Sequence, residues 1–165
     1  MLDERKYWIA FTLVKGIGAV RFEQIRAYFG DLSIAWNAPA EAFREAGLPS
    51  RALENFLKVR KDIDPDRMYE SILEKDVTVW TLLDEGYPRL LKQISQAPPV
   101  LYVRGGVTPA DEFAVAMVGT RRVSAYGQQV TRDASLYLAG HGLTIVSGLA
   151  RGVDGLAHQN ALKAG

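Results

Sequence analysis

The fold is decided by a stretch in which Phe113-Ala-Val-Ala-Met-Val118 runs directly into Gly119-Thr-Arg-Arg-Val-Ser124. The first six residues are apolar throughout, which predicts a strand buried in a parallel sheet. Ser124 is a residue type favoured as a helix N-cap, and apolar side chains recur at helical spacing after it. The face that they form comprises Val130, Ala134, Tyr137 and Leu138. The stretch therefore predicts a strand, a loop and a helix in succession.

A second strand-loop-helix unit follows without an evident sequence repeat. Gly140 and Gly142 end the first helix, and Leu143-Thr-Ile-Val146 predicts the next strand. The loop Ser147-Gly-Leu-Ala-Arg-Gly152 then leads into a helix from about Val153 to Lys163. If the two strands are neighbours, right-handed crossovers place both loops side by side at the carboxyl end of the sheet.

Two further candidate strands precede these units. They are Val77-Thr-Val-Trp-Thr-Leu82 and Val100-Leu-Tyr-Val-Arg104, separated by a short helix that Pro88 is suited to open. Strands that alternate with helices are typical of a parallel sheet with crossover connections. We therefore predict an α/β fold in which these strands join the same parallel sheet.

The N-terminal part of the chain has a different pattern. Residues 1 to about 63 place apolar side chains at three- and four-residue spacing, which predicts a bundle of short helices. The stretch Asp62-Ile-Asp-Pro-Asp66 contains turn residues and marks a boundary. We therefore assign residues 1–66 to a small helical domain, 67–76 to a helical connector and 77–165 to an α/β domain.

A Gly-x-Gly turn, Lys15-Gly-Ile-Gly18, lies between two of the predicted helices. Such a turn lets the backbone approach a phosphate and directs the next helix N-terminus at it. It resembles a helix-hairpin-helix element of DNA-binding proteins, and Ala46-Gly-Leu-Pro-Ser50 resembles a degenerate second copy. We weigh DNA contacts from Lys15, Gly16, Gly18 and Arg21 equally with a plain interhelical turn.

Composition narrows the class of protein. The chain has 165 residues, of which 48% are apolar, as expected for a packed globular protein. Its 20 Lys and Arg residues nearly balance 19 Asp and Glu residues, so any affinity for nucleic acid must come from local clusters of charge. There is no cysteine, and the apolar run from Tyr7 to Val14 is too short to span a membrane. We expect a soluble cytoplasmic protein.

The two loops of the α/β domain predict a site for an anion. Each loop offers backbone N–H groups, a hydroxyl and guanidinium charge beside a helix N-terminus, which suits consecutive phosphates. The candidate residues are Gly119, Thr120, Arg121, Arg122, Ser124, Ser147, Gly148 and Arg151. The alternative is that Arg121 and Arg122 pair with carboxylates elsewhere. For Tyr126 we favour a core position over stacking on a base.

Other chemistries find little support. A dinucleotide-binding G-x-G-x-x-G fingerprint and a phosphate-binding G-x-x-x-x-G-K-[ST] loop are both missing from these loops, so we expect no nucleotide cofactor. His141 and His158 have no neighbouring ligands at metal-site spacing, and we expect no metal. We assign Asp154 to holding its loop and His158 to packing against the sheet, not to catalysis.

Four blocks in order resemble the signature of the DNA-processing protein A family (DprA, also called Smf). They are Asp84-Glu-Gly-Tyr-Pro-Arg-Leu-Leu-Lys-Gln-Ile94, Pro98-Pro-Val-Leu-Tyr-Val-Arg-Gly105, Val118-Gly-Thr-Arg-Arg-Val-Ser-Ala-Tyr-Gly127 and Ser147-Gly-Leu-Ala-Arg-Gly-Val-Asp-Gly-Leu-Ala-His158. The resemblance implies a small domain similar to a sterile-alpha-motif (SAM) fold ahead of an extended Rossmann-like domain. That domain normally continues beyond the point where this chain stops, so we expect its C-terminal half to be truncated.

The resemblance also implies a function. Members of that family bind and protect single-stranded DNA during natural transformation, help to load the RecA recombinase, form homodimers and are not known as enzymes. It places Gly119, Arg121, Arg122, Ser147 and Gly148 at the phosphates, with Arg121 foremost. The alternative is a Rossmann-like protein that binds a small nucleotide or cleaves a nucleoside monophosphate, with Asp154 or His158 acting on it.

Overall fold

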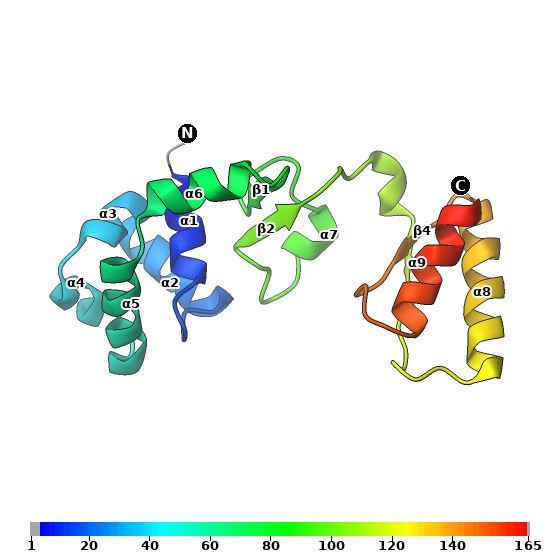
Figure 1. The fold of residues 1–165 in the computed structure, drawn as a ribbon. Coiled ribbons are helices and arrows are strands. Elements are labelled where there is room, and N and C mark those ends of the chain that lie inside the picture. The colour runs from blue at the N-terminus through cyan, green and yellow to red at the C-terminus, as the bar shows by residue number, and fades with distance from the viewer. Residues whose placement is uncertain (1–3, 165) are drawn as a thin grey trace. The chain divides into compact units, whose positions relative to one another are not determined.

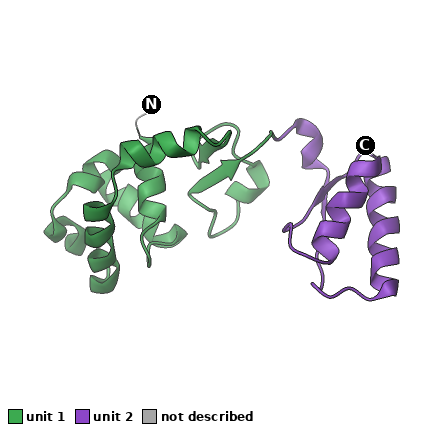
Figure 2. Cartoon of the chain, in the orientation of Figure 1, with its two compact units in different colours: residues 1–106 green, residues 107–165 purple. Residues whose placement is uncertain are grey.

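The computed structural model describes residues 4–164, so the outermost residues of the two predicted domains, 1–3 and 165, lie outside the described residues. The chain forms two compact units, residues 1–106 and 107–165 (Figure 2). The sequence pattern places the start of the second domain at residue 77, whereas the contacts divide the chain after Gly106.

Unit 1 begins with six helices, as Figure 1 shows in blue to green. Two of them start at aspartate N-caps: the carboxylate of Asp31 accepts from the amide of Ser33 at 2.5 Å, and that of Asp64 from the amide of Asp66 at 3.0 Å. The helices are α1 (Arg5–Thr12), α2 (Ala19–Phe29), α3 (Leu32–Asn37), α4 (Ala40–Glu45), α5 (Ser50–Asp62) and α6 (Pro65–Leu73). The predicted helical bundle is confirmed.

An aromatic cluster forms the centre of the bundle. Phe11 of α1 is fully buried and stacks on Phe56 of α5, with ring centroids 5.2 Å apart and an interplanar angle of 7°. Trp36 of α3 meets Phe11 and Phe56 edge to face, at 5.5 Å and 5.4 Å. Phe43 of α4 lies 4.5 Å from Phe56. Aromatic pairs in these geometries add stability beyond their buried area, so this cluster fixes how four of the helices pack.

The first two strands form a hairpin of unit 1, and the expectation that they join the parallel sheet is wrong. β1 (Thr78–Thr81) pairs with β2 (Val100–Val103) in antiparallel register, with Thr78 opposite Val103. The segment between them contains only the four-residue helix α7 (Arg89–Lys92). Val79 and Val100 are buried in the same hydrophobic core as the aromatic cluster.

Local hydrogen bonds explain why the chain turns back after β1. The Asp84 carboxylate accepts from the Thr81 amide at 2.6 Å, and Arg5 of α1 forms an ion pair with the same carboxylate. Burial raises the pKa of Asp84, but these bonds outweigh burial and hold the pKa below its usual value. The Tyr87 hydroxyl then donates to the Pro98 carbonyl at 2.8 Å, which places the returning segment beside the outgoing one.

Unit 2 contains the two strand-loop-helix units that the sequence predicts. It consists of a 3-10 helix (Pro109–Glu112), β3 (Ala114–Ala116), α8 (Ala125–Gly140), β4 (Thr144–Val146) and α9 (Val153–Ala164). β3 and β4 are parallel neighbours with Val115 opposite Ile145, and α8 and α9 pack on each other and on β4 (Figure 1). Fold class α/β, with a helical N-terminal region and a partial parallel sheet, is confirmed.

The buried face of α8 differs from the expected one. Thr131 and Ser135 are its buried residues, whereas Val130 and Tyr137 are 46% and 65% exposed. The hydroxyls of both buried residues donate to backbone carbonyls of the preceding turn, at 2.7 Å each, which satisfies them without water. Ala134 and Leu138 of the expected face are half-buried beside them. An apolar pattern that omits Ser and Thr therefore finds only part of the buried face of this helix.

We expect Phe11→Ala to lower the free energy of unfolding of unit 1 by about 3–5 kcal/mol, because the change empties the centre of the aromatic cluster. All three tryptophans, Trp8, Trp36 and Trp80, belong to unit 1, so urea unfolding followed by tryptophan fluorescence measures this unit. Ile34→Ala is the control: Ile34 is 60% exposed, and its loss is expected to cost within about 0.5 kcal/mol. Equal costs for the two variants would contradict this account of the core.

Candidate functional site

The loops that follow β3 and β4 touch each other backbone to backbone. The amide of Val153 donates to the Thr120 carbonyl at 3.2 Å. Gly152 has a φ of +96°, and a Cβ added to it would lie 2.3 Å from the Thr120 carbonyl oxygen and 2.7 Å from the Arg121 Cα. Only glycine fits both the backbone conformation and this contact. The expectation that the two loops lie side by side is confirmed.

A second close contact joins the end of β3 to the start of α9. A Cβ on Gly119 would lie 2.6 Å from a methyl carbon of Val153. Real side chains do not approach so closely, so a larger residue at position 119 would push the N-terminus of α9 away from the first loop. Gly119 therefore acts here through the packing that it permits between the two strand-loop-helix units.

Three hydroxyls that the sequence assigns to the anion hold the loops in shape. Ser124 caps α8 and accepts from the Gly127 amide at 3.1 Å, as predicted. The Thr120 hydroxyl accepts from the Arg122 amide at 3.1 Å, and the Ser147 hydroxyl donates to the Met117 carbonyl at 2.6 Å. These bonds fix the backbone of both loops, and they use the hydroxyl hydrogen of Ser147.

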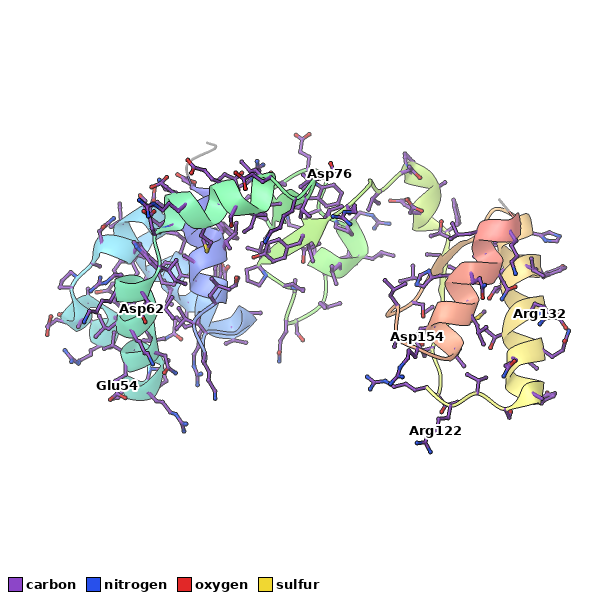
Figure 3. All side chains as sticks on the ribbon, viewed as in Figure 1. Glu54, Asp62, Asp76, Arg122, Arg132 and Asp154 are labelled. Carbon is purple, nitrogen blue, oxygen red and sulfur yellow. The ribbon has the colours of Figure 1, made fainter. Side chains whose placement is uncertain are left out.

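The arginines of the two loops are exposed and unpaired. Arg121, Arg122 and Arg151 all reach solvent, and none forms an ion pair within residues 4–164. Figure 3 shows Arg122 projecting away from its loop. The alternative in which Arg121 and Arg122 pair with carboxylates thus finds no partner in the part of the chain that the structure describes. Arg121 and Arg122 precede α8, which has no acidic residue in its first turn. Cations held beside such a helix N-terminus are electrostatically unfavourable, and an anion would relieve that cost.

Asp154 and His158 serve the loop that precedes α9. Asp154, near the start of α9 (Figure 3), is 8% exposed. Its carboxylate packs against Gly148, where an added Cβ would lie 3.0 Å from the Asp154 Oδ2. His158 places Nε2 3.3 Å from the Ser147 carbonyl, to which a ring N–H donates. Gly148 is exposed beside this buried carboxylate. The two side chains therefore support the end of β4 and its loop.

Two large exposed side chains, Tyr126 and Leu149, lie near the arginines in the sequence. Tyr126, in the first turn of α8, is 81% exposed, so its expected core position is wrong in this structure. Leu149 is 77% exposed and has a φ of +55°, a left-handed conformation that is uncommon outside glycine. Backbone strain of this kind is concentrated at functional sites. The sequence offers base stacking as the alternative for Tyr126, whereas no sequence pattern singles out Leu149.

A separate group of candidate residues lies in unit 1. Lys15, Gly16 and Arg21 line one pocket together, and Gly18 is the N-cap of α2 next to it. Gly16 has a φ of +100°, whereas Gly18 has an ordinary extended backbone and open space around it. The pocket also contains residues of the α4–α5 turn and of α5, which the sequence analysis did not connect with this site.

Two other features, a metal site and a membrane-spanning helix, are not found among residues 4–164. No group of three or more His, Cys, Asp or Glu residues suited to a metal ion occurs within residues 4–164. In the same range, no helix combines the length and the apolar character that crossing a membrane requires.

Comparison with known proteins gives a consistent result. The model of the family described as DNA recombination-mediator protein A matches residues 78–165, more than half of the chain. Protein Smf of Synechocystis sp. is 36% identical over 98% of this chain and 42% of its own length. DNA processing protein DprA of Bacillus subtilis is 34% identical over 59% of this chain and 33% of its own.

A solved structure extends the similarity to both units. The X-ray structure of DNA processing protein A (DprA) from Streptococcus pneumoniae matches with a TM-score of 0.70 and 27% identity. The match covers 96% of this chain and 54% of that chain. The chain thus spans less than half the length of the curated relatives named above and about half of the solved one.

We expect Gly152→Ala to destabilise unit 2 by about 1–3 kcal/mol, because it combines a strained φ with a clash against the first loop. Tryptophan fluorescence does not report on this unit, so hydrogen exchange of peptides within residues 143–164 is the measurement. Gly140→Ala is the control, since a Cβ there meets nothing within 4 Å. Unchanged exchange in Gly152→Ala would show that the loops do not need this contact.

Proposed function

Because the chain belongs to the DNA recombination-mediator protein A family, we propose that its unit 2 binds the phosphates of single-stranded DNA. The observation that carries this proposal is the set of three arginines, without an ion pair among residues 4–164, on two loops in backbone contact. Guanidinium groups fork onto phosphate oxygens, and the N-terminus of α8 adds backbone N–H donors. Consecutive phosphates of one strand match this distribution of donors along two adjacent loops.

The same residues argue for binding without chemistry. A hydrolytic site needs a general acid or base within reach of the substrate. Asp154 is buried, and His158 contacts a backbone carbonyl, so neither side chain is presented beside the arginines. We therefore propose that the protein is not an enzyme, and that a nucleoside monophosphate is not its substrate.

The wider role proposed for the protein follows from its family. Relatives are named DNA processing proteins, and we propose a role in processing DNA taken up in natural transformation. In this role the whole protein would protect single-stranded DNA in the cytoplasm, assist loading of the RecA recombinase and act as a homodimer. The exposed donors on the two loops of unit 2 support the DNA-binding part of this role.

We expect Arg121→Ala to weaken binding of a fluorescein-labelled thymidine homopolymer by about three- to tenfold. The slope of log affinity against log salt concentration should fall by about one, which corresponds to one lost phosphate contact. Fluorescence anisotropy at several salt concentrations measures both. Arg132→Ala is the matched control: Arg132 is an exposed arginine of α8 without an ion pair in the described part of the chain, and Figure 3 shows it on the far side of that helix from α9.

Two results would reject the proposal. One is an affinity of Arg121→Ala equal to that of the wild type. The other is release of free base when the protein is incubated with nucleoside monophosphates, which would favour the enzymatic alternative. Loss of that release in His158→Ala or Asp154→Asn would assign the reaction to this chain.

Tyr126 provides a second test of the same site. Aromatic rings stack on unpaired bases with about 1–3 kcal/mol per base and little sequence preference. We expect Tyr126→Ala to weaken binding of the homopolymer while leaving the salt dependence unchanged, because stacking releases no counterions. Tyr137→Ala, which removes another exposed tyrosine of α8 farther from the loops, is the control. Equal effects of both variants would exclude a specific contact with Tyr126.

A further inference from the structure

Unit 1 contains a pocket that belongs to neither loop of unit 2. Its volume is about 220 Å³, and it is lined by Lys15, Gly16, Arg21, Pro49, Arg51, Ala52 and Asn55. These residues come from the turn between α1 and α2, from the start of α2 and from the first two turns of α5. The lining contains three cationic side chains and no carboxylate.

The turn that forms one wall is held from two sides. Arg21 donates from its guanidinium to the Gly16 carbonyl at 2.5 Å, and Asn55 donates to the Lys15 carbonyl at 2.7 Å. The carbonyl oxygens of Lys15 and Gly16 thus each accept a hydrogen bond from a side chain. A guanidinium has five N–H donors, so Arg21 retains others for a ligand. Because the turn is held by side chains that line the pocket, the wall is formed before any ligand arrives.

Two helices begin at this pocket without side-chain caps. Gly18 precedes α2 and Pro49 precedes α5, and neither offers a side-chain oxygen to the first amides of its helix. Neither helix has an acidic residue in its first turn. Uncapped N–H groups and the helix dipole favour an anion at both positions.

The charges at the pocket are not neutralised within the protein. Lys15, Arg21 and Arg51 form no ion pair among the described residues. Glu54 follows Arg51 by three positions on α5, a spacing that permits an ion pair, yet the two do not form one. Three cations and two uncapped helix starts therefore converge on one small cavity whose lining contains no carboxylate.

We propose that this pocket binds one phosphodiester group of a nucleic-acid backbone, as a second phosphate site separate from the loops of unit 2. Its volume of about 220 Å³ is several times the roughly 30 Å³ that one water takes in the liquid, which accommodates a phosphate group. Arg51 and Lys15 supply charge, and the amides of the turn and of α5 supply directed donors. The choice of nucleic acid as the ligand rests on the proposed function, whereas the phosphate chemistry rests on the pocket alone.

Arg51→Glu is the sharpest variant, because its replacement breaks no hydrogen bond or ion pair within the described residues. We expect it to weaken binding of a labelled DNA strand by about tenfold, and Lys61→Glu, the same charge change on another face of α5, by less than about twofold. Urea midpoints followed by tryptophan fluorescence should be equal in the two variants. Equal affinities of the two variants would overturn the proposal.

Nuclear magnetic resonance of the full chain separates this site from the one in unit 2. Inorganic phosphate and a short DNA strand should each shift the amides of Gly16, Gly18 and Ser50 in the wild type, and not in Arg51→Glu. DNA that shifts only the loops 119–124 and 147–152 would overturn the second site and leave the proposed function intact. Phosphate that shifts the pocket amides while DNA does not would overturn the nucleic-acid assignment.

The two sites can also be tested together. Distant, independent contacts contribute additively to the free energy of binding. Arg51→Glu should therefore weaken binding by a similar factor in the wild type and in Arg121→Ala. A loss that appears in both backgrounds while Arg121→Ala itself has no effect would reject the proposed role of unit 2 and support the pocket. If adding Arg51→Glu to Arg121→Ala causes no further loss of affinity, the pocket is not an independent second site.

Discussion

The arrangement of unit 2 depends on one backbone contact. Because Gly152 lies against the carbonyl of Thr120, with space for no side-chain atom, α9 begins directly beside the first loop. Val153 then packs on Gly119, which connects the second strand-loop-helix unit to the first. As a result, charges from sequence positions far apart, on Arg121 and Arg151, lie on adjoining loops. The proposed phosphate site is thus built mainly by backbone, and the arginines add charge to a surface that the glycines have already shaped.

Much of unit 2 follows from local sequence. The apolar runs before Gly119 and Ser147 correctly predict two strands, and Ser124 correctly predicts the start of α8, because strand burial and helix capping are local effects. The handedness of the crossovers then places the loops together. What local sequence does not report is how each hydroxyl is used: Ser147 bonds to Met117, a residue of another strand segment.

The error on the α8 face comes from local hydrogen bonds of Thr131 and Ser135, whereas other differences concern contacts between residues distant in sequence. Arg5 and the carboxylate of Asp84 help to turn β1 back into a hairpin, and no strand periodicity encodes that direction. Tyr126 is exposed, and its position in the helical pattern does not determine whether another element covers it. The pocket of unit 1 joins Lys15 to Asn55 through a hydrogen bond across 40 positions. A local sequence motif predicts the turn at Lys15–Gly18, but it does not predict that α5 packs against this turn.

The hairpin determines where chimeras of two homologous proteins can be joined. Since Val79 and Val100 complete the core around the aromatic cluster, a chimera joined near residue 76 would combine the helical part of one core with the hairpin residues of another. Gly105 and Gly106 lie at the division between the two units, and a side chain at either position would meet nothing within 4 Å. Exchange between homologous genes at this point would transfer each hydrophobic core whole. The chain thus contains a junction at which its parts can be replaced independently in evolution or in the laboratory.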